Sequence, residues 1–83
     1  MQRLRWAVVG AEVRGLPHRD VANVLDYLDA GEGQVGMELL CTQLYEYDVA
    51  LPVAEIEELE DLGRLLSVDP ELTEALRENA APS

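Results

Sequence analysis

The chain has 83 residues, of which 17 are acidic and six are basic, so its formal net charge at pH 7 is −11. This length allows one domain with a small core and leaves little interior for a deep catalytic cleft. The negative charge disfavours nucleic acid and anionic membranes as partners and favours basic proteins.

Cysteine content and hydropathy bear on where the protein acts. The single cysteine excludes an intrachain disulfide, and the N-terminus lacks the pattern of a secretion signal. The longest apolar runs are far shorter than the roughly 20 residues that cross a bilayer. We therefore expect a cytoplasmic protein with no membrane partner.

Composition and turn signals predict an all-α fold, a single domain over residues 1–83 built as a small bundle of four to five short helices. Hydrophobic residues make up 48% of the chain and phenylalanine is absent, so leucine, valine and alanine must supply the core. Proline fits a first helical turn and glycine a helix end. These signals separate the expected helices at residues 15–17, 31–33, 50–52 and 69–70.

Residues 2–14 carry two apolar stripes at helical spacing rather than one. A helix is expected, and a strand over residues 6–9 stays open as an alternative. Trp6 is expected in the core. The two stripes consist of Leu4, Ala7, Val8 and Ala11, and of Trp6, Val9 and Val13.

Residues 17–30 follow the plain pattern of an amphipathic helix. The inward stripe is expected to contain Val21, Val24, Leu25 and Leu28, and the aspartates facing elsewhere are Asp20, Asp26 and Asp29.

Residues 34–48 form a third helical segment with a wide apolar arc. Tyr47 is expected in the core, whereas Tyr45 falls at the boundary beside Glu38. The residues of the inward arc are Gly36, Met37, Leu40, Cys41, Leu44 and Tyr47, and the opposite arc holds Glu38, Thr42, Gln43 and Glu46.

The last two segments cover residues 52–66 and the helix that starts near Asp69. In the first of them, Gly63 is expected to let a neighbouring helix approach closely, and Glu60 is expected to pair with Arg64. In the second, Asp69 is the expected cap, and residues 79–83 are expected to fray. The inward residues of the two segments are Ile56, Leu59, Leu62, Gly63, Leu66, Leu72, Ala75 and Leu76.

The usual residues of an active site are missing, so we expect neither enzymatic activity nor a metal or cofactor. His18 has no nearby cysteine or second histidine, which leaves metal binding and acid–base catalysis without their minimum set. Cys41 lies among apolar and acidic neighbours that raise the pKa of a thiol. An acyl carrier protein is also short and acidic, but it needs a serine in an Asp-Ser-Leu context that this chain lacks.

Twelve carboxylates and no basic residue lie between Arg19 and Arg64. Tyrosine next to carboxylates combines an apolar body, a hydroxyl and charge, and tyrosine is a frequent binding anchor. We therefore expect the third and fourth helical segments to present a partner-binding face to a basic protein. Its residues are Glu38, Tyr45, Glu46, Asp48, Glu57 and Asp61.

Part of the chain resembles the MafI-type immunity proteins, small acidic helical proteins encoded beside bacterial polymorphic toxins. The resemblance covers roughly residues 16–66, and its most specific part is residues 37–48 (MELLCTQLYEYD). Further likeness lies in residues 19–25 (RDVANVL), residues 31–33 (GEG) and the helix start at residues 51–52 (LP). The resemblance implies a cytoplasmic antidote that binds a cognate toxin domain and blocks it without chemistry.

A second interpretation is an adaptor or regulatory protein that pairs with itself or with a transcription factor. Leu39, Leu65 and Gly63 are the residues that such pairing would use. The sequence leaves open the oligomeric state, the identity of any toxin, and whether an active site would be plugged or blocked from beside.

Overall fold

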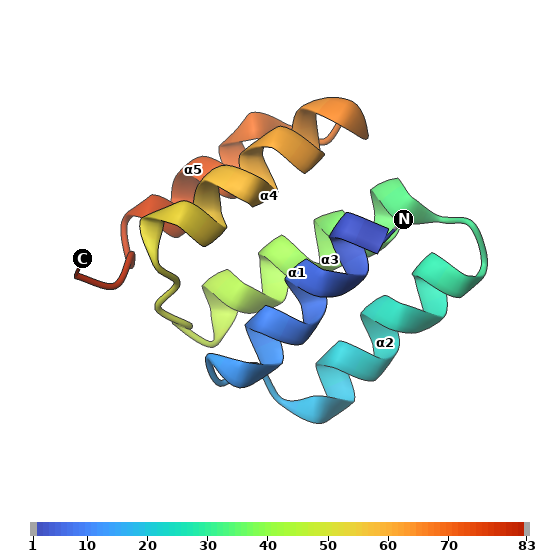
Figure 1. The fold of residues 1–83 in the computed structure, drawn as a ribbon, viewed down its shortest axis with the longest axis horizontal. Helices are drawn as coiled ribbons and strands as arrows, with labels where there is room; N and C mark the ends of the chain where they lie inside the picture. Colours follow the sequence, from blue (N-terminus) through green and yellow to red (C-terminus); the bar gives the residue numbers. More distant parts are fainter. Residues whose placement is uncertain (1, 83) are drawn as a thin grey trace.

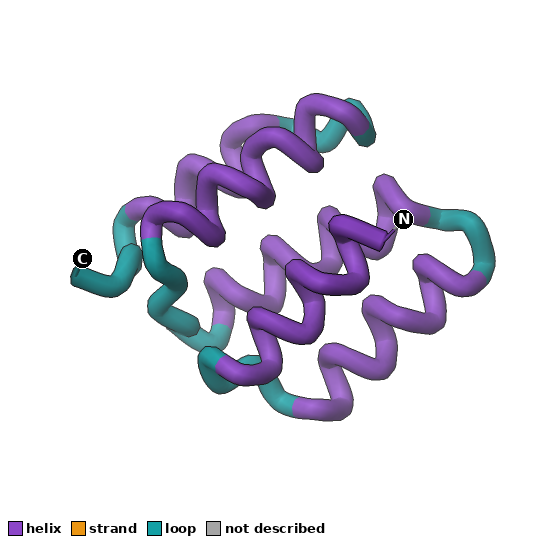
Figure 2. Tube along the Cα trace, viewed as in Figure 1, coloured by secondary structure: helices purple, strands orange, loops and turns teal. Residues whose placement is uncertain are grey.

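The computed structural model describes residues 2–82, and within this range the chain forms helices and no strands (Figures 1 and 2). The all-α prediction is confirmed. Residues 6–9 lie inside the first helix, so the strand alternative is wrong. The helices are α1 (Gln2–Val13), α2 (His18–Asp29), α3 (Gly33–Glu46), α4 (Val53–Leu65) and α5 (Pro70–Arg77).

Four of the helices form a bundle in which α1 and α4 make one side and α3 and α5 make the opposite side (Figure 1). α4 and α5 form a hairpin that packs on α1 and α3. α2 packs against α1 and α3 at the far edge from this hairpin. Within the described residues α3 and α4 are therefore one of the two diagonal pairs of this bundle, and their outer faces point away from each other.

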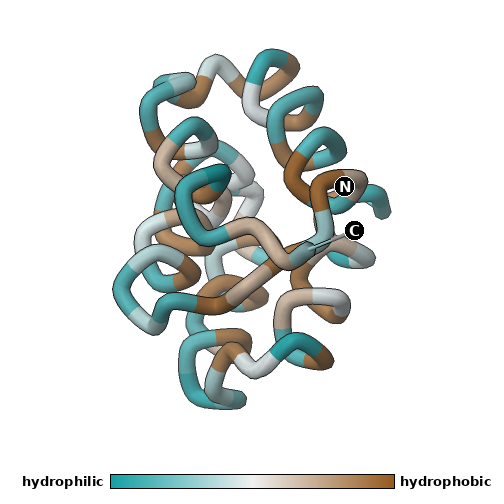
Figure 3. The backbone as a smooth tube through the Cα atoms, turned by 90° about the vertical axis from the view of Figure 1, so that its left-hand side faces the viewer, coloured by the Kyte–Doolittle hydropathy of each residue, from teal (hydrophilic) through white to brown (hydrophobic). Residues whose placement is uncertain are grey.

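The core is a single cluster with contributions from all five helices. Each of its larger aliphatic side chains contributes roughly 1.5–3 kcal/mol when it is buried completely. Hydrophobic and hydrophilic positions alternate along the helices, so that each helix offers an apolar side to this cluster (Figure 3). The fully buried larger side chains are Leu4, Val8, Leu16, Val24, Met37, Leu40, Cys41, Leu44 and Ile56.

The first two helices end where the sequence predicted, at glycines that adopt positive φ. Gly15 has φ of 121° and Gly31 has φ of 78°. In each case the next amide donates across the helix end, from Leu16 to the Ala11 carbonyl at 3.0 Å and from Glu32 to the Tyr27 carbonyl at 2.8 Å. This Schellman arrangement satisfies carbonyls that would otherwise lack a partner.

The third and fourth helices end in the same way without glycine. Asp48 has φ of 52° and Ser67 has φ of 59°, both in the left-handed region. The following valines, Val49 and Val68, are buried and donate their amides back to the helix that has just ended. A buried residue after the left-handed one fixes the direction in which the chain leaves the helix.

Two aromatic residues expected in the core lie at the surface instead. Trp6 is 67% exposed, because α1 buries the stripe of Leu4, Val8 and Ala11 and turns the Trp6 stripe outward. Tyr47 is 43% exposed, because α3 ends at Glu46 and Tyr47 lies in the turn that follows the helix. The first expectation failed because spacing alone does not say which face meets a neighbour, and the second failed because the helix ends before Tyr47.

Close helix packing depends on Gly36, not on Gly63. A Cβ atom at Gly36 would lie 2.9 Å from Leu28 Cδ2 and 3.3 Å from the Cβ of Tyr27, so α2 and α3 approach each other through this glycine. A Cβ atom at Gly63 would lie 3.6 Å from Met37 Cε, which is ordinary van der Waals contact. The expected role of Gly63 was therefore wrong, although the residue is buried.

The C-terminal helix begins as expected and the segment after it is partly held. The Asp69 side chain accepts a hydrogen bond from the Glu71 amide at 2.9 Å, which confirms the cap. Residues 79–83 were expected to fray, but Ala80 packs against the core and the Ala81 amide donates to the Leu51 carbonyl at 2.9 Å. Residue 83 lies outside the described range.

Candidate protein-binding surface

The six residues predicted for partner binding lie on two separate surfaces. Glu38, Tyr45 and Glu46 lie on α3, and Asp48 follows its end, whereas Glu57 and Asp61 lie on the outer face of α4. All of them reach the surface, Glu38 being the least exposed. Because α3 and α4 are a diagonal pair of the bundle, these two groups cannot form one continuous face.

The arginines are distributed unevenly over the helices and decide which carboxylates stay uncompensated. Every arginine with a carboxylate partner within residues 2–82 belongs to α1, α4 or α5, or follows α1 directly. No ion pair in that range involves a residue of α3. The pairs are Arg3–Glu58, Arg14–Glu55, Arg5–Asp29, Arg77–Glu60 and Arg64–Asp61.

One predicted pair on α4 has different partners in the structure. Glu60 bonds Arg77 of α5 at 2.7 and 2.8 Å, and Arg64 bonds Asp61 instead of Glu60. A two-pronged bond between an arginine and a carboxylate is stronger than a single contact, so Arg77 holds Glu60. This bond also lowers the pKa of the Glu60 carboxyl from its ordinary value of 4.5.

The acids on α3 and α5 have no such partners. Most exposed or half-exposed carboxylates of these two helices and of the turn after α3 are grouped here as the α3–α5 surface, and no described arginine forms an ion pair with any of them. α3 and α5 pack side by side, so these charges reinforce one another. The residues of the α3–α5 surface are Glu38, Glu46, Asp48, Glu71 and Glu78, together with Tyr45, whereas Glu74 lines a hollow between α4 and α5 with Glu60 and Arg64.

Tyrosines and acids meet at the C-terminal end of α3. Tyr45 is 50% exposed, and the corrected position of Tyr47 adds a second surface tyrosine to the same turn. Asp48 is held in its left-handed conformation by the hydrogen bond of its own amide to the Tyr45 carbonyl, at 3.1 Å. The result is two aromatic rings and two carboxylates, Glu46 and Asp48, on a fixed turn.

The orientation of α3 is fixed on its other side by a buried polar contact. The Gln43 side-chain amide donates to Asp20 Oδ1 at 2.6 Å and so joins α3 to α2. Asp20 is only 4% exposed, and its Oδ2 atom has no hydrogen-bond partner among the described residues. Both residues had been expected to face solvent. The spacing within each helix allowed both side chains to face solvent, but the close approach of α2 and α3 covers Asp20 and Gln43.

Cys41 and His18 are the side chains that were considered for nucleophilic, acid–base or metal chemistry. Cys41 is buried in the core, and burial raises the pKa of its thiol to about 12, which keeps it protonated at neutral pH. His18 lies at the surface with its Nδ1 atom 2.7 Å from Glu12 Oε2. Residues 2–82 contain no group of three histidine, cysteine or acidic side chains that could hold a metal ion.

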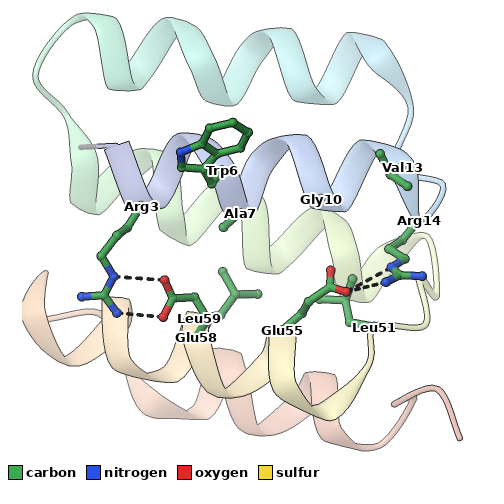
Figure 4. Close-up of a pocket in the computed structure, with 10 residues that line it drawn as sticks. All are labelled: Arg3, Trp6, Ala7, Gly10, Val13, Arg14, Leu51, Glu55, Glu58 and Leu59. Carbon is green, nitrogen blue, oxygen red and sulfur yellow. Dashed lines mark hydrogen bonds and ion pairs between the residues drawn. The ribbon is translucent and has the colours of Figure 1, made fainter. Parts of the chain in front are cut away.

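Sequence reasoning missed a groove of about 340 Å³ between α1 and α4 (Figure 4). Ala7, Gly10 and Leu59 lie along it, and the exposed Trp6 and Val13 stand at its edge. A signal was present, since Trp6, Val9 and Val13 form a second apolar stripe on α1. Of that stripe, Trp6 was expected in the core.

The residues proposed for an adaptor do not share one surface either. Gly63 is buried and faces Met37, so it offers no docking point. Leu39 is partly buried against the core, and Leu65 is exposed on α4.

Comparison with known protein families, with characterised proteins and with solved structures found no match to this chain. Among residues 2–82, each helix is too short or too polar to span a bilayer.

Proposed function

We propose that this protein is an immunity protein that binds and neutralises a bacterial polymorphic toxin domain in the cytoplasm, through the α3–α5 surface. The observation that carries the proposal is the uneven distribution of arginines, which leaves the carboxylates of this surface without partners. Uncompensated charge costs the free protein stability through self-repulsion. A basic partner would remove that cost on binding.

The chemistry of the surface suits a nuclease toxin. A nuclease holds the phosphates of its substrate in a basic channel, and carboxylates on a rigid helix can occupy the same positions. Opposite charges speed the encounter of two proteins, with association rate constants up to about 10⁸–10⁹ M⁻¹s⁻¹ at low salt. A desolvated aromatic side chain slows dissociation, and Tyr45 is the candidate for that role.

The resemblance of residues 37–48 to MafI-type immunity proteins agrees with this proposal, since these residues include α3 from Met37 onward and the turn at Asp48. A small acidic adaptor would use the same charges. The two functions differ in their partner, because an immunity protein binds the toxin encoded beside it and abolishes that toxin's activity.

The test is a kinetic binding measurement against the C-terminal domain of the protein encoded by the gene immediately upstream. We expect one-to-one binding, loss of the toxin's activity, and an association rate that falls at least tenfold between low and high salt. Tyr45→Ala should mainly speed dissociation. Tyr27→Ala is the matched control, because Tyr27 is similarly exposed but lies on α2.

A second pair of variants separates the two acidic surfaces. Glu38→Gln combined with Glu46→Gln should slow association at low salt, whereas Glu57→Gln combined with Asp61→Asn should change it little. The reverse result would move the site to α4. An association rate that does not respond to salt would refute the electrostatic mechanism, and failure to bind the neighbouring toxin would leave the adaptor as the better explanation.

A further inference from the structure

The groove between α1 and α4 combines an apolar floor with paired charges at both ends (Figure 4). Arg3 bonds Glu58 at 2.8 and 3.0 Å at one end. At the other end, Arg14 bonds Glu55 at 2.7 and 3.1 Å. Between these two ion pairs the lining residues are apolar or glycine.

The outer side of α1 continues this apolar floor onto the surface. Trp6 is 67% exposed, Val13 is 76% exposed and Val9 is 48% exposed. These residues are separated by three and four positions, so they form one stripe along the helix. A contiguous exposed apolar surface of this kind marks an interaction site.

Charge identifies what kind of molecule can cover this stripe. The charged residues that line the groove are two arginines and two glutamates, so their charges cancel. The opposite α3–α5 surface carries carboxylates that no described arginine pairs with, and the chain as a whole carries −11. A basic protein is drawn to the acidic surface rather than to the neutral groove. Two copies of this chain repel each other least when they meet at the groove.

The groove and the stripe also complement each other. An antiparallel pair of α1 helices, centred near Val9 and Gly10, would place Trp6 of one copy beside Val13 of the other. Gly10 leaves room for the groove of about 340 Å³ beside it, where Glu55 Oε1 of the same molecule lies 3.3 Å from the position that a Cβ atom would take. In that arrangement the Arg3–Glu58 pair of one copy faces the Arg14–Glu55 pair of the other, so the charged residues that meet at each end of the contact sum to zero.

We propose that two copies of this chain associate through the α1–α4 groove, with Trp6 of each copy inserted into the groove of the other. A standard stable interface covers roughly 800 Å² per partner. This area is about one sixth of the 4868 Å² surface of one copy. The broad side of the molecule, which measures 34 × 25 Å, is large enough to supply it. The contact leaves the α3–α5 surface of each copy free on the opposite side, so the dimer would bind two partner molecules.

The only tryptophan of the chain reports directly on this contact. Sedimentation and tryptophan emission are measured on the purified protein from about 1 μM to about 1 mM, a range that includes the affinities of modest interfaces. We expect the mass to rise from 9.2 kDa to twice that value, with a shift of Trp6 emission to shorter wavelength over the same concentrations. The two changes should follow one binding curve.

Val13→Glu should abolish both changes, because it places a charge in the contact without touching the core. Val35→Glu is the matched control, since Val35 is an exposed valine on α3, away from the groove. A protein that stays monomeric over the whole range overturns the proposal, as does a dimer that Val13→Glu leaves intact. A monomer whose Trp6 emission shifts only when the toxin domain is added would assign the groove to the toxin.

Discussion

At the scale of single residues, the most informative positions are those that accept an unfavourable backbone conformation. Asp48 and Ser67 both adopt positive φ at the ends of α3 and α4, where Gly15 and Gly31 serve at the ends of α1 and α2. The left-handed region is unfavourable for residues with a side chain, and it is less unfavourable for aspartate than for most because its carboxylate can accept a local hydrogen bond. At Asp48 the chain keeps a carboxylate on the α3–α5 surface at the cost of some stability.

Asp48→Gly should raise the free energy of unfolding by about 0.5–1 kcal/mol, since relief of the left-handed strain exceeds the extra entropy of glycine in the unfolded chain. Urea unfolding at neutral pH measures the change. Ser67→Gly provides the control, because it relieves the same strain without removing a charge. We expect both variants to gain stability and only Asp48→Gly to slow toxin association. Loss of stability in both would contradict the helix-end geometry.

At the scale of helices, the close approach of α2 and α3 determines which side of α3 reaches solvent. Gly36 allows the two helices to touch, and the Gln43–Asp20 hydrogen bond holds them in register. With that side covered, Glu38, Tyr45 and Glu46 remain on the open side of the helix. The position of the proposed binding surface therefore depends on a contact that contains none of its residues.

Gly36→Ala should destabilise the fold by about 1 kcal/mol. The added methyl group must displace Leu28 and Tyr27, and the energetic cost of that displacement exceeds the gain in helix propensity. Gly63→Ala should instead stabilise it by about 0.5–1 kcal/mol, since its methyl group would meet only ordinary contacts. Denaturant unfolding of both variants gives the comparison. Equal effects of the two substitutions would show that α2 and α3 lie farther apart than described.

At the scale of the whole molecule, charge is sorted between opposite sides of the bundle. The ion pairs of α1 and α4 join helices whose residues lie far apart in the chain, such as Arg3 with Glu58. The opposite side carries carboxylates without arginine partners. This sorting gives the molecule a side on which most carboxylates are paired with arginines and a side on which they are not, and it supports separate roles for the two.

Added salt should stabilise the protein, because screening weakens the repulsion among 17 carboxylates more than it weakens a few surface ion pairs. We expect the melting temperature to rise between about 10 and 150 mM sodium chloride, where the Debye length shortens from about 30 to about 8 Å. Glu74→Gln combined with Glu78→Gln should raise the melting temperature at low salt and flatten its dependence on salt. A melting temperature that falls with salt would mean that the ion pairs dominate.

The sequence by itself determined the all-α class, the approximate boundaries of the helices and most of the core. Proline and glycine marked the boundaries, Asp69 was recognised as a cap, and the apolar spacing of α2 and α4 identified their buried sides. These features could be predicted because each depends on residues within one or two helical turns. The burial of Cys41 followed from the same local pattern.

Only the tertiary structure decided which of the two stripes of α1 is buried, which acids are compensated, and which glycine brings helices together. Trp6 and Val8 both lie on apolar stripes, and the choice between them depends on where α2, α3 and α4 pack. Spacing shows which residues share a face but not what that face meets. The division of the predicted site between α3 and α4 arises in the same way, because the diagonal placement of two helices is a property of the bundle and not of either segment.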